Sequence, residues 1–97
     1  MRVRFTLTAK WELREIGQYT AANNPEAALR LEAAIRRAAS SLQMMPWRGR
    51  KQKTRNVRKI GTGKYSYDNF YQIDKTAQVV TIVSIRHAAR RPRLKNT

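Results

Sequence analysis

Residues 79–85, Val-Val-Thr-Ile-Val-Ser-Ile, constrain the fold most because their β-branched side chains form a nearly continuous run. Such side chains favour extended backbone, and an uninterrupted apolar run is typical of a strand buried on both faces. We therefore predict a central strand here. Residues 55–60 and 64–73 supply two more strands, with a bulge expected at residues 68–69 and turns at 61–63 and 74–77. Together they predict a three-strand antiparallel meander.

The first half of the chain predicts a strand followed by two helices. Residues 2–7 alternate polar and apolar, as in a half-buried strand, and Thr8 can cap a helix over residues 9–22. Asn24 and Pro25 predict the start of a second helix, which Pro46 ends. The apolar stripe of this helix is Ala27, Ala28, Leu31, Ala34, Ile35, Ala38, Leu42 and Met45.

The short connection between the two helices predicts an antiparallel helical hairpin. The order of strand, helix, helix and meander then predicts an α+β fold of two layers, in which the hairpin covers one face of the sheet. With 97 residues the chain is long enough for one domain, which we expect to span residues 1–97. Residues 91–97 are expected to form a basic C-terminal tail.

Net charge is the strongest indication of function. The chain has 21 Lys and Arg against 6 Asp and Glu, giving +15 at pH 7. So large an imbalance favours a polyanionic target or an acidic protein partner over a merely solvated surface. No acidic residue occurs from residue 33 to residue 67.

Several classes of protein are excluded or disfavoured. The absence of cysteine excludes disulfides, thiolate catalysis and cysteine zinc sites, and it fits a cytoplasmic protein. No apolar run approaches the roughly 20 residues that cross a membrane. The alternating residues after Met1 do not resemble a signal peptide.

Basic residues cluster in the second half of the chain. If the meander brings strand ends together, Arg58, Lys64, Arg86 and His87 converge on one face. The residues expected to contact a target or partner are Arg50, Lys51, Lys53, Arg55, Arg58, Lys64, Tyr65, Arg86, His87, Arg90 and Arg91.

Aromatic residues are interleaved with these cations. Tyr65, Tyr67, Phe70, Tyr71 and Trp47 could stack on bases, although packing within the sheet is the more frequent role of aromatic residues in strands. Trp11 and Trp47 are likewise expected to pack in the interior.

The residues available for catalysis are few. His87 is the single histidine, so no multi-histidine metal site can form, and neither a metal nor another cofactor is expected. The glutamates, Glu12 among them, look like solvated helix charges, and no pair of carboxylates is suitably placed. One reaction remains feasible, which is metal-independent RNA cleavage with His87 as base or acid. Arg58, Lys64 and Arg86 would stabilise the phosphorane. We favour the alternative, in which His87 has no catalytic role.

Several segments, taken in order, resemble the RelE/ParE toxin superfamily. They are residues 3–19 at the first strand and helix, 24–31 at the second helix, 45–50 after it, Arg58, 63–65 and 71–74 in the sheet, and 83–92 at the last strand. The resemblance covers about residues 2–94. It implies a toxin of a type II toxin–antitoxin module, held in a hetero-oligomer by an acidic antitoxin that folds on binding.

The superfamily divides by target. RelE-like members cleave mRNA on the ribosome, and ParE-like members are associated with inhibition of DNA gyrase. The RelE-like set includes a tyrosine near the C-terminus, whereas no tyrosine follows Tyr71 here. This departure favours the ParE branch and gyrase as the target. His87 keeps a ribosome-dependent mRNA endonuclease as the alternative, and a basic nucleic-acid-binding module is the third hypothesis.

Overall fold

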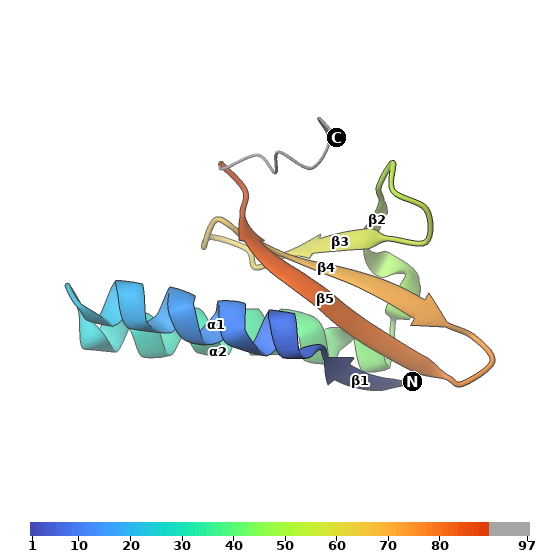
Figure 1. The fold of residues 1–97 in the computed structure, drawn as a ribbon, viewed down its shortest axis with the longest axis horizontal. Coiled ribbons are helices and arrows are strands. Elements are labelled where there is room, and N and C mark those ends of the chain that lie inside the picture. The colour runs from blue at the N-terminus through green and yellow to red at the C-terminus, as the bar shows by residue number, and fades with distance from the viewer. Residues whose placement is uncertain (90–97) are drawn as a thin grey trace.

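The computed structural model describes residues 1–89, in which two helices lie along one side of a twisted sheet (Figure 1). The elements are β1 (Arg2–Phe5), α1 (Leu7–Ala21), α2 (Pro25–Ser40), the 3-10 turns η1 (Ser41–Gln43) and η2 (Pro46–Arg48), β2 (Arg50–Lys51), β3 (Arg58–Gly61), β4 (Tyr67–Asp74) and β5 (Val79–His87). The sheet order is β1-β5-β4-β3-β2. The predicted α+β architecture of strand, helical hairpin and antiparallel meander is confirmed.

β5 lies at the centre of the sheet, parallel to β1 and antiparallel to β4. Its exposure alternates: Val80 and Ile82 are buried, while Val79, Thr81 and Val83 are half-buried. The expectation that this strand is buried on both faces is therefore wrong. β5 is central because β1 and β4 pair with its two edges, which suits its β-branched residues. The helices cover only one of its two faces.

The β4–β5 ladder contains an irregularity, but not at residues 68–69 where the sequence suggested one. Phe70 faces Ser84 and Tyr71 faces Ile82, so the register passes over Val83. An extra residue of this kind bends a strand and increases its twist. Asn69 lies in regular pairing beside this point and faces the core.

The two helices begin at different kinds of cap. The hydroxyl of Thr6, not Thr8, accepts a hydrogen bond from the amide of Ala9 at 3.0 Å. α1 therefore begins at Leu7, which is 82 % exposed and does not extend the strand as predicted. The predicted cap of α2 is confirmed, because the side chain of Asn24 accepts from the amide of Ala27 and Pro25 takes the first helical position.

The segment after α2 differs from the sequence prediction. The α-helix ends at Ser40 rather than at Pro46, and two 3-10 turns replace its expected last turn. Leu42 stays buried, but Met45, predicted on the buried stripe, is 59 % exposed. β2, which sequence patterns did not indicate, follows these turns as a short edge strand. The predicted tail at residues 91–97 lies outside the described residues.

The core lies between the helical hairpin and the sheet. α1 packs mainly on β5 and α2 on β4, so Leu13, Ile35, Tyr71 and Ile82 meet in one cluster. Alanines such as Ala9 let the helices approach the sheet closely. The loop end of the hairpin projects past the strands (Figure 1). Neither α1 nor α2 has the length and apolar character needed to cross a membrane.

Candidate functional site

The predicted site residues fall at two separate ends of the sheet. Arg58 faces Tyr71 on β4, whereas Arg86 faces Asp68 three residues away along the same strand. Three residues along a strand and two strand spacings across it separate their backbones by about 14 Å. The predicted convergence of Arg58 with Lys64, Arg86 and His87 is therefore wrong.

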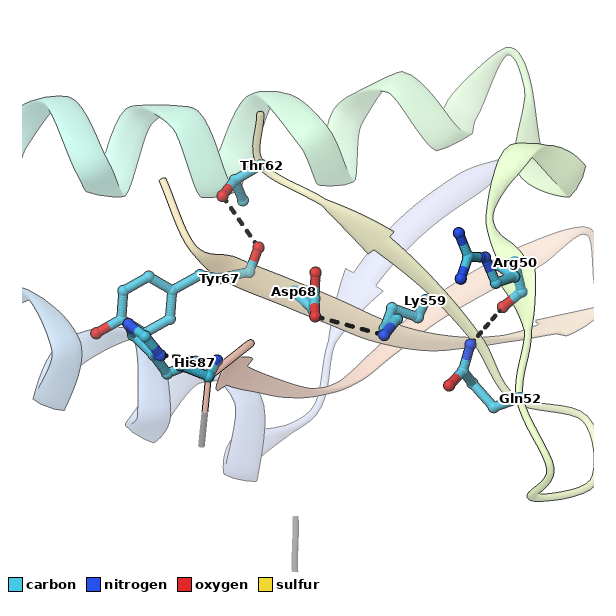
Figure 2. Close-up of polar contacts among 8 residues, drawn as sticks. Arg50, Gln52, Lys59, Thr62, Tyr67, Asp68 and His87 are labelled. Carbon is cyan, nitrogen blue, oxygen red and sulfur yellow. Dashed lines mark hydrogen bonds and ion pairs between the residues drawn. The ribbon is translucent and has the colours of Figure 1, made fainter. Parts of the chain in front are cut away.

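Lys64, Tyr65, Arg86 and His87 do lie at one end of the sheet, on the β3–β4 turn and the last residues of β5, although the consecutive residues Arg86 and His87 point to opposite faces. Tyr67 pairs with His87 across the ladder, and their rings meet edge to face with centroids 5.0 Å apart (Figure 2). The Lys64 ammonium lies 5.6 Å from the ring centroid of Tyr65. We call Lys64, Tyr65, Tyr67, Arg86 and His87 the hairpin-end cluster.

His87 has a defined orientation within this cluster. Its Nδ1 accepts a hydrogen bond from the amide of Ala89 at 3.0 Å, so the neutral ring carries its proton on Nε2. The carboxylate of Asp68 forms its ion pair with Lys59 at 3.7 Å (Figure 2). His87 therefore packs against Tyr67, and within residues 1–89 no hydrogen-bonded carboxylate holds its ring as in a catalytic triad.

Arg86 is anchored from behind by α1. Its Nε donates to the hydroxyl of Ser84 at 2.9 Å, and that hydroxyl donates to the carboxylate of Glu12 at 3.0 Å. Glu12 also accepts the amide of Ile85 at 2.8 Å. The prediction that Glu12 is a solvated helix charge is wrong, because it closes the edge of β5 beyond the last residue of β1.

Arg58 lies at the opposite end of the sheet and holds the loop after α2. One terminal nitrogen donates to the carbonyls of Trp47 at 3.1 Å and Gly49 at 2.7 Å. Its guanidinium carbon lies 5.2 Å from the centre of the Trp47 ring. Trp47 was expected in the interior, yet it is 50 % exposed. Backbone contacts of this kind give Arg58 a structural role.

Tyr71 supports the same loop from the core. Its hydroxyl donates to the carbonyl of Pro46 at 2.8 Å and accepts the amide of Gly49 at 2.9 Å. Burial raises the pKa of Tyr71, against the opposing effects of the Gly49 amide and of the Arg58 and Arg48 guanidiniums. Tyr71 is fully buried and cannot stack on a base as considered from the sequence.

Four more predicted contact residues lie on β2 and the loop that follows it, namely Arg50, Lys51, Lys53 and Arg55. All four are exposed. The loop is closed by a hydrogen bond from the amide of Gln52 to the carbonyl of Val57, and the side chain of Gln52 donates to the carbonyl of Arg50 (Figure 2). Arg90 and Arg91 lie outside the described residues.

A groove between α1 and α2 is a feature that the sequence analysis missed. It has a volume of about 680 Å³. Its lining residues are Phe5, Lys10, Leu13, Arg14, Gly17, Gln18, Ala21, Pro25, Ala28, Leu29, Glu32 and Arg36. The floor is apolar and the rim is mainly basic. The small residues Gly17, Ala21 and Ala28, which lie where the helices face each other, are the signal that could have indicated it.

Metal chemistry finds no support in the geometry of residues 1–89. No group of three or more histidine, cysteine or acidic side chains lies close enough to hold an ion there. The loop with Arg50, Lys51, Lys53 and Arg55 is cationic and the helical groove has an apolar floor, which suits the binding of anionic or amphipathic partners.

Comparison with known proteins gives concordant results. The model of the family described as "ParE toxin of type II toxin-antitoxin system, parDE" matches residues 3–92. A Sinorhizobium fredii protein named "Putative toxin Y4kP" is 32 % identical over 82 residues, which cover 84 % of this chain and 85 % of that protein.

Two solved structures share the fold. A chain of the chromosomal ParDE toxin–antitoxin system from P. aeruginosa has a TM-score of 0.81 at 20 % identity, covering 90 % of this chain and 95 % of its own. A chain of the intact E. coli RelBE toxin–antitoxin complex has a TM-score of 0.69 at 18 % identity, covering 92 % and 98 %.

Proposed function

The chain belongs to the ParE toxin family of type II toxin–antitoxin systems, and on this premise we propose that it inhibits DNA gyrase in the cytoplasm without cleaving a substrate. The observation that carries the proposal is the separation of Arg58 from the hairpin-end cluster. A metal-independent ribonuclease needs its proton-transfer group and its phosphate-stabilising cations around one phosphate. The backbones of Arg58 and His87 are about 16 Å apart by the same geometry, and the Arg58 guanidinium bonds to the loop after α2, so the two side chains do not share one phosphate.

Gyrase inhibition requires binding rather than bond cleavage, and the hairpin-end cluster offers a suitable surface. Arg86 is fixed through Nε by Ser84, so its terminal nitrogens are directed by a rigid anchor. Lys64 adds a second cation at the same end of the sheet, on the turn before β4. A pre-oriented guanidinium binds a carboxylate or phosphate with little loss of side-chain entropy.

A gyrase supercoiling assay with purified protein tests the proposal. We expect inhibition, or trapped cleaved DNA, at concentrations where the Arg86→Ala and Lys64→Ala variants are at least tenfold weaker. Arg30→Ala is the matched control, since Arg30 is an exposed cation on α2, far in the fold from the cluster. Undiminished supercoiling with folded protein would contradict the proposed target.

Neutralisation is assigned to an acidic antitoxin that forms a hetero-oligomer with the toxin. We propose that an amphipathic segment of this antitoxin occupies the groove between α1 and α2. Its apolar side chains would cover Leu13, Ala28 and Leu29, while its carboxylates meet Lys10 and Arg14. A segment that folds on binding loses part of its binding energy to ordering, which leaves the complex open to release.

This assignment is tested by a Gly17→Leu substitution, which places a large side chain in the groove. Nothing lies within 4 Å of a Cβ at Gly17, so the fold tolerates the change while the groove fills. We expect calorimetric affinity for the cognate antitoxin to fall by at least tenfold. Gln72→Leu is the control, because Gln72 is exposed on β4, away from the groove. Unchanged antitoxin affinity of Gly17→Leu would exclude the groove as the binding site.

Ribosome-dependent mRNA cleavage is the second candidate, favoured by the position of His87 against Tyr67 at the end of the sheet that also carries Lys64 and Arg86. Primer extension on mRNA from a translating extract detects it as cuts at defined positions. Under this alternative His87→Ala abolishes cutting, whereas gyrase inhibition depends little on His87. Arg58→Ala is a poor test of either function, because it also removes the support of the loop at Trp47.

A further inference from the structure

Trp47 is exposed to solvent on a loop that two side chains, Tyr71 and Arg58, hold in place. The Tyr71 hydroxyl bonds to both Pro46 and Gly49, and Arg58 bonds to the carbonyls of Trp47 and Gly49. Arg58 also lies over one part of the indole ring. Exposing a tryptophan to water costs free energy, because its ring is largely apolar. Trp47 is nevertheless 50 % exposed, on a loop whose backbone is held by hydrogen bonds.

Arg58 lies over this indole, and two further cations, Arg48 and Lys51, belong to the same loop and the strand that follows it. Lys51 pairs with Arg58 across the β2–β3 ladder, so both side chains leave the sheet on the same face. Arg48 lies near enough to act electrostatically on Tyr71, which bonds to the same loop. The ion pairs among residues 1–89 join Arg30 to Glu26, Arg36 to Glu32 and Lys59 to Asp68, and include none of these cations. We call Trp47, Arg48, Lys51 and Arg58 the indole surface.

We propose that the indole surface binds single-stranded nucleic acid, with a base stacked on Trp47 and adjacent phosphates held by Arg48 and Lys51. A rigid aromatic ring beside cations matches the alternation of bases and phosphates along a single strand. Duplex nucleic acid keeps its bases stacked inside and offers only its phosphates. This activity is separate from gyrase inhibition and uses the other end of the sheet.

An acidic peptide is the competing occupant. The exposed methionines Met44 and Met45 border the surface, and methionine, tryptophan and arginine are also common in protein interfaces. The cations alone would serve either partner. The contact of Trp47 with Arg58 favours nucleic acid, because a ring supported by a guanidinium and half exposed to solvent can serve as an aromatic platform for a base.

Fluorescence anisotropy with a labelled oligothymidylate and the full chain tests the proposal. Two phosphate contacts, at Arg48 and Lys51, predict a slope of about −1.4 for log K against log salt between roughly 50 and 200 mM. We expect Trp47→Ala to weaken binding about tenfold with little change of slope, because stacking contributes about 1–3 kcal/mol per base. The double change Lys51→Ala and Arg48→Ala should instead flatten the slope.

Controls separate this site from general electrostatic attraction. Trp11→Ala removes the other tryptophan, exposed on α1, and should leave affinity unchanged. Trp47→Phe keeps a ring that can stack and should restore most of the affinity lost in Trp47→Ala. Equal affinity of Trp47→Ala and the parent chain would overturn the proposal. So would equal binding of a duplex of the same length, or tighter binding of a polyglutamate peptide.

Discussion

The hydroxyl of Tyr71 occupies the space that a side chain at Gly49 would need. Gly49 donates its amide to that hydroxyl at 2.9 Å, and a Cβ at this position would overlap the Tyr71 ring and the carbonyl of Lys59. Because the tyrosine is fully buried and also bonds to Pro46, it has no room to withdraw. The glycine is thus required by packing rather than by an unusual backbone conformation, since its φ is −74°.

Gly49→Ala is therefore expected to destabilise the fold by about 1–3 kcal/mol, the usual range for overpacking of a well-filled interior. Urea unfolding followed by circular dichroism measures the difference. Gly17→Ala is the matched control, because a Cβ there meets nothing within 4 Å and the residue lies inside α1. That variant should gain about 0.5–1 kcal/mol from helix propensity. Equal effects at the two glycines would contradict this account.

Tyr71 should also make the protein sensitive to alkali. Burial raises its pKa in the folded state above the value near 10 of an unfolded tyrosine. Below about pH 10 both states are protonated and the stabilisation is complete. As pH rises further the unfolded chain ionises first, so stability falls until the folded pKa is reached.

Urea midpoints measured from pH 8 upward reveal this decline, which should be weaker in Tyr71→Phe. The parent chain and Tyr19→Phe, which changes an exposed tyrosine, are expected to lose stability in parallel. An unaltered alkaline decline in Tyr71→Phe would assign the effect to other groups.

The hydrophobic patterns were sufficient to predict the layers of the fold. Asn24 and Pro25 mark the start of α2 because their capping chemistry is local, and the β-branched run of residues 79–85 marks the central strand. The short strand β2 left no such signal. Arg50 and Lys51, the two residues of β2, show no alternation of apolar and polar side chains. They form a strand only because they pair with β3.

The candidate site was harder to predict because it depends on strand register. Charge counting selected cations such as Arg50 and Lys51, which are exposed and whose role as contact residues stays a prediction. It could not tell that Arg58 turns toward the loop after α2. The position of Trp47 follows from the same loop. Glu12 resembled any helix glutamate, and its contact with β5 spans more than seventy residues of sequence. Long-range polar contacts of this kind carry no periodic signature.

Replacing the buried polar side chain of Asn69 by an apolar one is expected to stabilise the fold. It is fully buried between Ile60 and Ile85 in the ladder, and its Oδ1 has no hydrogen-bond partner. Its amide nitrogen makes one long bond of 3.3 Å to the carbonyl of Ile35. An unsatisfied buried acceptor costs about 1–3 kcal/mol.

Asn69→Val should therefore raise the free energy of unfolding by about 1 kcal/mol, since valine suits a buried strand and removes the orphan acceptor. Asn69→Asp keeps the shape but buries an acid, and it should lose stability at neutral pH and recover part of it when protonated. Chemical denaturation at neutral and acid pH measures both variants. Destabilisation by Asn69→Val would show that the amide has a partner, such as an internal water.

The contacts of Glu12 predict non-additive mutational effects between α1 and β5. Glu12→Ala leaves the Ile85 amide and the Ser84 hydroxyl without their acceptor and should cost about 2 kcal/mol. Glu12→Gln retains an oxygen acceptor and should cost less. Glu15→Ala, on the exposed side of the same helix, is the control and should stay within about 0.5 kcal/mol of the parent chain.

A double-mutant cycle of Glu12→Ala and Ser84→Ala isolates the link between the two side chains. Because Ser84 relays Glu12 to Arg86, we expect the combined loss to fall short of the sum by about 1 kcal/mol. Either single change should also weaken gyrase inhibition more than its loss of stability explains, since Arg86 then loses its anchor. If the two losses of unfolding free energy are additive and gyrase inhibition is unchanged, Arg86 does not depend on α1. Glu12 would then stabilise only the edge of β5.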